Sequence, residues 1–288
     1  MLKGTSTALI TPFTNDEIDF SALEKLLDFQ LNGGVDSLVV LGTTGEPATL
    51  TRNEKIAVVS FVVNHVKGKL PIIVGAGANS TATTIENAKL YTDLGADGLL
   101  MVTPYYNKCT QTGLVEHFTK VAEKTSLPII LYNVPGRTGV NMLPETFQVL
   151  QDVDNIVAVK EASGNMEQIE EYLRISKGKA DVLSGDDGLT VPIMAMGGKG
   201  VISVASNILP KYVSTMTKSV LDGDLNTAVN MQLKLLPLIK ALFQEVNPIP
   251  IKMGAEILGL CSSSLRLPLT KLTDKNTALL KGLLSEFV

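Results

Sequence analysis

The sequence predicts an α/β protein folded as a (β/α)8 TIM barrel with a C-terminal helical extension. Short apolar runs rich in β-branched residues alternate with amphipathic stretches, which is the pattern of strand–helix units. Eight such runs are present, and most begin about 25 to 34 residues apart, enough for one strand, one helix and two loops. Buried parallel strands fit either a closed barrel or an open sheet covered on both faces, and eight evenly spaced units favour the barrel.

The predicted elements follow one another in order along the chain. The strands lie in runs that begin at Thr5, Asp36, Leu70, Asp97, Leu127, Asn155, Ala180 and Lys199. In the first intervening segment, Ser21 is expected to cap a helix, with Glu24 at the capping-box position. Gly33 and Gly34 are expected to end that helix. The last interval spans only about 19 residues, so the seventh helix should be short.

After the eighth strand the pattern changes, and no further strand is predicted. Residues from about 208 to 288 have the spacing of four helices, of which the first is expected to complete the barrel. We therefore expect a catalytic barrel over residues 1–223 and a three-helix extension over residues 224–288.

Composition excludes several classes of protein. The 288 residues are 45% hydrophobic, enough for a substantial core, and the formal net charge of -4 argues against a nucleic-acid partner. The apolar runs are too short to span a membrane, and the N-terminus is typical of a first strand rather than a signal peptide. Only Cys109 and Cys261 are present, too few for a disulfide framework. These features indicate a cytoplasmic globular protein.

Lys160 is the residue that core packing does not explain. It follows Val-Ala-Val in the sixth predicted strand, and lysine is rarely buried without a partner. It could pair with Glu161, extend its amine to solvent, or act as a nucleophile that forms a Schiff base. Burial among apolar neighbours would favour the neutral amine that such a nucleophile requires. The local sequence leaves all three interpretations open.

Other strand ends carry polar groups, and in a barrel these ends meet at one face. The turn Gly42-Thr43-Thr44-Gly45-Glu46 offers backbone N–H groups and two hydroxyls for a carboxylate, although it also fits an ordinary turn. Tyr132 could pass a proton or simply bury a satisfied hydroxyl. Arg137 offers a planar fork for a second carboxylate, or is a lone surface arginine.

Two further signals are rejected. The segment Gly75-Ala76-Gly77 lacks the third glycine of a dinucleotide loop. Asp186 and Asp187 suggest metal ligands, but both histidines lie on predicted helices and do not converge with them. A metal-dependent aldolase is therefore disfavoured.

Motifs along the whole chain carry a family resemblance: ALITPF, GTTGE, GAGANST, TPYYNK, YNVPGRTG, VKEASGN, SGDD, GGKGVISVASN and NPIPIKMGAE. With these motifs the chain resembles the pyruvate-dependent class I aldolases of the dihydrodipicolinate synthase/N-acetylneuraminate lyase superfamily. Within this superfamily the chain resembles the synthase branch, because the lyases usually have a serine in the GTTGE turn and no arginine in the YNVPGRTG segment; Arg137 is the discriminating residue.

The resemblance implies a reaction and roles for named residues. Pyruvate condenses with L-aspartate-4-semialdehyde to 4-hydroxy-tetrahydrodipicolinate, in lysine (diaminopimelate) biosynthesis. Lys160 forms the imine with pyruvate, so no metal or organic cofactor is required. Thr43 and Thr44 hold the pyruvate carboxylate, and Tyr132, Thr44 and Tyr106 form a proton relay.

The same resemblance implies the rest of the pocket and the assembly. Arg137 binds the carboxylate of the aldehyde, and Gly185 and Ile202 line the pocket through backbone groups. Tyr106 reaches across a dimer interface into the neighbouring site, so a homodimer is the minimum unit and a homotetramer, a dimer of dimers, is the usual assembly.

The chain departs from the lysine-inhibited members of the family. Those members have serine, two histidines and a glutamate where this chain has Pro47, Arg52, Lys55 and Thr83, although Asn79 and Tyr105 match. Two cations would repel the ammonium group of lysine, so weak or absent inhibition is expected.

Two alternatives remain. A sister aldolase would use the same imine with a sugar acid or a hydroxy-oxo acid. A catalytically dead barrel would serve as a binding or scaffold protein, against which the intact set of Lys160, Tyr132, Thr44 and Tyr106 argues.

Overall fold

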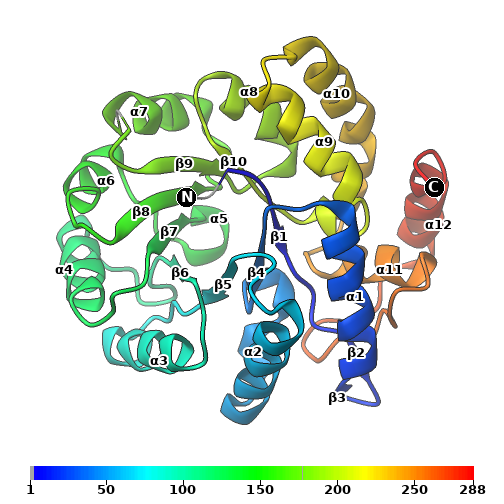
Figure 1. Cartoon of the computed structure of the whole chain (residues 1–288), viewed down its shortest axis with the longest axis horizontal. Coiled ribbons are helices and arrows are strands. Elements are labelled where there is room, and N and C mark those ends of the chain that lie inside the picture. The colour runs from blue at the N-terminus through cyan, green and yellow to red at the C-terminus, as the bar shows by residue number, and fades with distance from the viewer. Residues whose placement is uncertain (1–2, 177) are drawn as a thin grey trace.

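Eight parallel strands close into a barrel in the computed structural model, which describes residues 3–176 and 178–288 (Figure 1). β1 pairs with both β4 and β10, which closes the ring. The barrel strands are β1 (Gly4–Ala8), β4 (Ser37–Val40), β5 (Ile72–Gly75), β6 (Gly98–Val102), β7 (Ile129–Asn133), β8 (Ile156–Glu161), β9 (Asp181–Ser184) and β10 (Gly200–Ser203). Each coincides with one of the predicted runs, although β1 begins one residue before its run, so the predicted barrel is confirmed. A small antiparallel hairpin, β2 (Phe13–Thr14) and β3 (Glu17–Ile18), follows β1.

Helices surround the sheet, as Figure 1 shows. Those of the barrel are α1 (Phe20–Gly33), α2 (Arg52–Val66), α3 (Thr81–Asp93), α4 (Gln111–Ala122), α5 (Pro135–Thr138), α6 (Pro144–Leu150), α7 (Met166–Ser176), α8 (Thr190–Ala195) and α9 (Pro210–Leu221). Short 3-10 helices are η1 (Thr43–Gly45), η2 (Pro47–Thr49), η3 (Asp187–Leu189) and η4 (Ala205–Asn207). The helix between β9 and β10, α8, has only 6 residues, which confirms the predicted short seventh helix.

The start of α1 differs from the prediction. Asp19, not Ser21, is the cap: its Oδ1 accepts a hydrogen bond of 2.9 Å from the N–H of Ala22. The other oxygen of Asp19 accepts from the hydroxyl of Thr14 at 2.8 Å, and the helix begins two residues earlier than expected. These hydrogen bonds, led by the one from Ala22, lower the pKa of Asp19. Gly34 adopts φ 71° after the last turn, so the predicted end is confirmed.

Side chains fill the interior of the barrel because successive residues of a strand point to opposite faces. Nearly all of this filling is aliphatic, and the members of the inner cluster are Ala8, Val39, Ile73, Leu100, Ile130, Tyr132, Val134, Ala158, Leu183 and Ile202. Tyr132 is the one member with a polar group, and it lies beside Lys160 in the register of β7 and β8. These two polar side chains therefore meet near the carboxyl ends of β7 and β8.

Three helices follow the barrel: α10 (Leu225–Leu242), α11 (Ile249–Ile257) and α12 (Asp274–Leu284). They lie along one side of the molecule, where α10 packs against α8 and α9, and α12 packs against α10 and α11 (Figure 1). Leu235 and Leu280 belong to the same apolar cluster as Val201 of β10 and Val213 of α9, so this segment shares a core with the barrel. The division of the chain into a barrel, residues 1–223, and a three-helix extension, residues 224–288, stays a prediction. In the described part of the chain, none of the helices is long and apolar enough to cross a membrane.

Candidate active site

A cavity of about 840 Å3 opens at the carboxyl ends of four neighbouring strands, β4 to β7. Three of the predicted site residues, Thr43, Tyr132 and Arg137, line it. The strand ends therefore meet as the barrel requires. Residues of the C-terminal segment close its other side: Val246, Asn247, Pro248, Pro268 and Leu269.

Lys160 is not among the residues that line this cavity, but it lies beside Tyr132, which is. Its side chain is 6% exposed, and its Nζ is 4.2 Å from the centre of the Tyr132 ring. Glu161 points to the opposite face of β8, where it accepts hydrogen bonds from Asn133 at 2.8 Å and from the N–H of Ser163 at 2.7 Å. Burial raises the pKa of Glu161. Among the described residues no carboxylate forms an ion pair with Lys160, so the pairing with Glu161 is wrong. Because Lys160 is buried, an amine extended to solvent is wrong as well.

Gly185 makes room for this lysine. The glycine follows β9, and its N–H donates to the carbonyl of Glu161 at 2.7 Å. A Cβ at this position would lie 3.0 Å from Cε of Lys160 and 2.7 Å from Cβ of Ala162. The lysine can therefore occupy this position only because residue 185 has no side chain. Ile202 is 1% exposed and packs in the inner cluster.

The threonine turn, residues 42–46, is a single turn of 3-10 helix. The N–H of Gly45 donates to the carbonyl of Gly42 at 2.9 Å, and that of Glu46 to the carbonyl of Thr43 at 3.2 Å. Thr43 is half-buried and faces the cavity, whereas Thr44 is buried. The Oγ1 of Thr44 accepts a hydrogen bond of 3.0 Å from the amide of Asn247.

Asn247 is a site residue that sequence reasoning did not identify. Its amide contacts Thr44, and its backbone carbonyl accepts a hydrogen bond of 3.1 Å from Nη2 of Arg137. The side chain is buried, and its Oδ1 has no hydrogen-bond partner among the described residues. The only sequence signal was its place in the NPIPIKMGAE motif, which carries no chemical role by itself.

Arg137 and Tyr106 both lie at the surface of this chain. Arg137 extends from the short helix α5 and lines the same cavity as Thr43. Tyr106 is 85% exposed and has a left-handed φ of 75°. Within the described part of the chain no hydrogen bond joins Tyr106 to Tyr132 or Thr44. The chain alone does not assemble the predicted relay.

The same cavity is also lined by the residues at which the chain departs from the lysine-inhibited members of the family. All six of the compared positions line it: Pro47, Arg52, Lys55, Asn79, Thr83 and Tyr105. Burial lowers the pKa of Lys55. Two basic residues, Arg52 and Lys55, are thus among those that line the cavity.

The acidic pair after β9 has a structural role. The carboxylate of Asp187 accepts from the N–H groups of Val204 and Ala205, at 2.9 and 3.0 Å, and so holds the loop after β10. Burial raises the pKa of Asp187. Asp186 caps η3 through the N–H of Gly188. The described residues contain no group of three or more His, Cys, Asp or Glu placed to hold a metal ion.

Comparisons with known proteins agree over the whole chain. The sequence model of the dihydrodipicolinate synthetase family matches residues 1–287. The 4-hydroxy-tetrahydrodipicolinate synthase of Alkaliphilus oremlandii is 49% identical over 276 residues, covering 96% of this chain and 95% of that protein. The synthase of Geobacter sulfurreducens is 48% identical over 287 residues, covering 100% and 99%.

Solved structures give the same result. Dihydrodipicolinate synthase from Thermotoga maritima superposes with a TM-score of 0.98 at 44% identity, covering 99% of this chain and 98% of that one. A structure described as the first monomeric dihydrodipicolinate synthase variant gives a TM-score of 0.97, also at 44% identity, covering 99% and 96%.

Proposed function

Because the chain belongs to the dihydrodipicolinate synthetase family, we propose that it condenses pyruvate with L-aspartate-4-semialdehyde to 4-hydroxy-tetrahydrodipicolinate. The single observation that carries the mechanism is a buried lysine with no described carboxylate partner, packed against Tyr132, a residue that lines the cavity. The reaction belongs to lysine (diaminopimelate) biosynthesis. We place it in the cytoplasm, where the two free cysteines of this chain would stay reduced.

In the proposed reaction, Lys160 attacks the ketone carbon of pyruvate, and one water leaves as the imine forms. The methyl carbon then loses a proton to give an enamine, whose carbon attacks the aldehyde carbon of the second substrate. Finally, the amine of that substrate attacks the imine carbon, closes the ring and releases Lys160. The burial of the lysine supports this sequence, because water has little access to compete for the intermediates.

Protons move in this scheme through Tyr132, Thr44 and Tyr106. The hydrogen bond from Asn247 to the oxygen of Thr44 supports the relay, because it leaves the hydroxyl proton of Thr44 free to be donated to another group. We propose that Tyr106 comes from a second copy of the chain, since it is 85% exposed here. The homodimer is then the smallest active unit, and a homotetramer is the proposed assembly.

The two substrates would bind by their carboxylates. Thr43, Thr44 and the N–H groups of their turn suit the carboxylate of pyruvate. Arg137 uses only part of its fork on the carbonyl of Asn247, so further donors remain for the carboxylate of the aldehyde. Gly185 and Ile202 are proposed to line the pocket through backbone groups. The chemistry is that of the lysine amine, and the proposal involves neither a metal nor an organic cofactor.

Borohydride reduction in the presence of pyruvate tests this proposal. Mass spectrometry should find a reduced pyruvyl group on Lys160 in the parent and none in Lys160→Met. Lys179→Met is a matched control, because that lysine lies on the surface. A parent that gains no adduct contradicts the enzyme and favours a binding or scaffold role. Turnover with aspartate semialdehyde, compared with cleavage of acetylneuraminate and 2-keto-3-deoxygluconate, separates the synthase from its sister aldolases.

Lysine is expected to inhibit weakly or not at all. Arg52 and Lys55 line the cavity with positive charge, and an ammonium group placed there would be repelled. Initial rates measured with increasing L-lysine check this expectation. Strong inhibition at sub-millimolar lysine contradicts it.

A further inference from the structure

Glu46 is the last residue of the threonine turn and the point at which the loop changes direction. It lies between η1 and η2 and has a left-handed φ of 54°, which side chains other than glycine rarely adopt. Its N–H closes η1 onto Thr43, and its carbonyl accepts from the N–H of Thr49 at 3.2 Å. A change in the position of Glu46 would therefore move the threonines before it.

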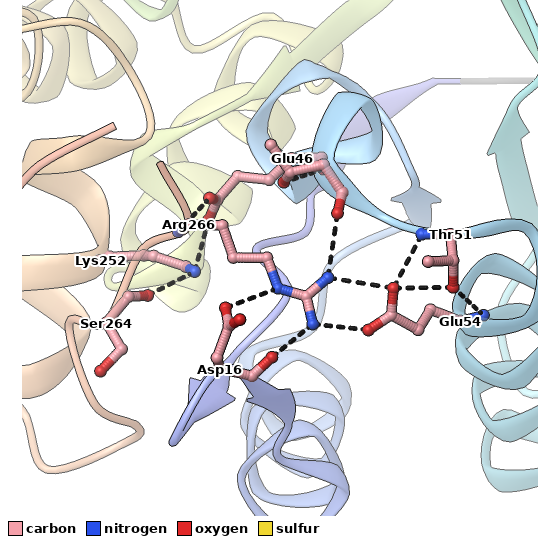
Figure 2. A network of polar contacts seen from close by, with 8 residues as sticks. Asp16, Glu46, Thr51, Glu54, Lys252, Ser264 and Arg266 are labelled. Atoms are coloured by element: carbon pink, nitrogen blue, oxygen red, sulfur yellow. Dashed lines mark hydrogen bonds and ion pairs between the residues drawn. The ribbon is translucent and has the colours of Figure 1, made fainter. Parts of the chain in front are cut away.

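The side chain of Glu46 is buried and is held by the C-terminal segment (Figure 2). Its carboxylate forms an ion pair with Nζ of Lys252 on α11, and it accepts from the N–H of Arg266 at 3.4 Å. Lys252 is 0% exposed. Its amine also donates to the carbonyl of Ser264 at 2.8 Å and lies 4.0 Å from the centre of the Phe13 ring. Burial lowers the pKa of Lys252, and Glu46 opposes that shift.

Arg266 holds the other end of the same loop. Its guanidinium donates to both oxygens of Glu54, at 3.0 and 2.5 Å, and to the carbonyl of Thr49 at 3.0 Å. It also donates to the backbone and carboxylate of Asp16, as Figure 2 shows. Residues 46–54 are thus attached to the segment after α10 at both ends.

A buried ion pair contributes little net stability, because the cost of removing two charges from water offsets most of their attraction. In some proteins such a pair instead fixes the geometry between the two segments that carry it. Here one of those segments ends the turn whose threonines face the cavity. The other belongs to α11.

We propose that Glu46 and Lys252 are positioning residues for pyruvate binding: their ion pair holds the threonine turn in the geometry that receives the pyruvate carboxylate, and Arg266 fixes the far end of the loop. This inference rests on the proposed function. Neither side chain needs to touch the substrate. The pair acts through Thr43 and Thr44.

The test is the double variant Lys252→Met with Glu46→Gln, which removes both charges and leaves none buried alone. Its Tm should stay within a few degrees of the parent, whereas Lys252→Met alone should melt much earlier. The pyruvate concentration for half-maximal borohydride trapping of Lys160 should rise about tenfold or more. The KM for aspartate semialdehyde should change less than about threefold, because Arg137 donates to the backbone carbonyl of Asn247 and to neither member of the ion pair.

A folded double variant with the parental half-saturation for pyruvate overturns the inference. If the double variant does not fold, Arg266→Met decides in the same way: a raised half-saturation supports the proposal and a parental one overturns it. Lys179→Met removes a lysine whose ion pair with Asp152 is exposed, and it should match the parent in every measurement. A parent that forms no adduct refutes the proposed function itself, whereas unchanged variants of an active parent refute only the positioning role.

Discussion

Gly185 shows how closely the reactive lysine depends on a residue without a side chain. Gly185→Ala should shift Lys160, because the added Cβ would lie 3.0 Å from Cε of the lysine and 3.0 Å from the carbonyl of Glu161. Misplacing a reacting group by about 1 Å costs on the order of 100-fold in rate, so kcat/KM should fall by about that factor. Crowding should also cost about 1–3 kcal/mol of the free energy of unfolding.

Steady-state kinetics and urea unfolding measure both effects. Gly282→Ala is the matched control, since a Cβ added there meets nothing within 4 Å. Gly185→Ala with parental kcat/KM would show that the lysine does not need the space.

Glu54 gives the molecule a pH-dependent contribution to stability. Its hydrogen bonds with Arg266 lower its pKa from 4.5 to about 2, so its contribution is complete above pH 4.5 and is lost as the pH falls toward 2. Glu54→Gln should therefore be less stable than the parent at pH 7, by about 1–2 kcal/mol, from the loss of a charge-assisted bidentate pair. The difference should shrink as the pH approaches about 2.

Urea unfolding at several pH values between 7 and 2.5 checks this expectation. Glu171→Gln is the control, because the partner of Glu171 is Arg174 on the same exposed helix face. A Glu54→Gln difference that is the same at every pH would show that the charge of Glu54 does not contribute.

At the scale of elements, the position of the first cap can be tested directly. Asp19→Ala removes the acceptor for the N–H of Ala22 and should cost about 1 kcal/mol of the free energy of unfolding. Ser21→Ala should cost less than about 0.5 kcal/mol, because Ser21 lies inside the helix rather than at its cap. Urea denaturation of the two variants gives the comparison. If the two variants lose equal amounts of the free energy of unfolding, Asp19 is not the more important cap and the expectation is contradicted.

The elements also show what the sequence could and could not predict. The strands, the short α8 and the end of α1 follow from local patterns of apolar residues and glycines. The start of α1 was misplaced because Asp19 and Ser21 are both good caps and only the fold selects one. The short helix α5 was not foreseen, because a single turn that begins at Pro135 has no periodicity to detect.

The site divides in the same way. Thr43, Tyr132 and Lys160 were found because a barrel brings strand ends together wherever they occur in the sequence. Asn247 and the pair of Glu46 with Lys252 were missed, because those contacts join residues about 200 positions apart and leave no local pattern. The roles of Tyr106 and Arg137 came from the family resemblance and stay predictions.

At the scale of the whole molecule, the proposed exchange of Tyr106 between two copies predicts complementation. Tyr106→Phe and Lys160→Met should each be nearly inactive alone. In a mixed dimer, the chain with an intact lysine receives an intact tyrosine from its partner, so one of the two sites is complete. Random mixing should then restore about a quarter of the parental activity, because half of the dimers are mixed.

Activity measured after the two variants are unfolded together and refolded tests this prediction. The control is each variant refolded alone, which should remain inactive. If the mixture stays as inactive as its parts, Tyr106 does not act across an interface.

The contacts of Asn247 have a consequence for anyone who tries to retarget this enzyme to a new acceptor. One asparagine touches the turn for the first substrate through its amide and the arginine for the second through its carbonyl. The two halves of the pocket therefore share one residue, and a change at Arg137 that admits a different aldehyde also removes a contact of the residue that holds Thr44. Acceptor choice and pyruvate affinity would have to be redesigned together.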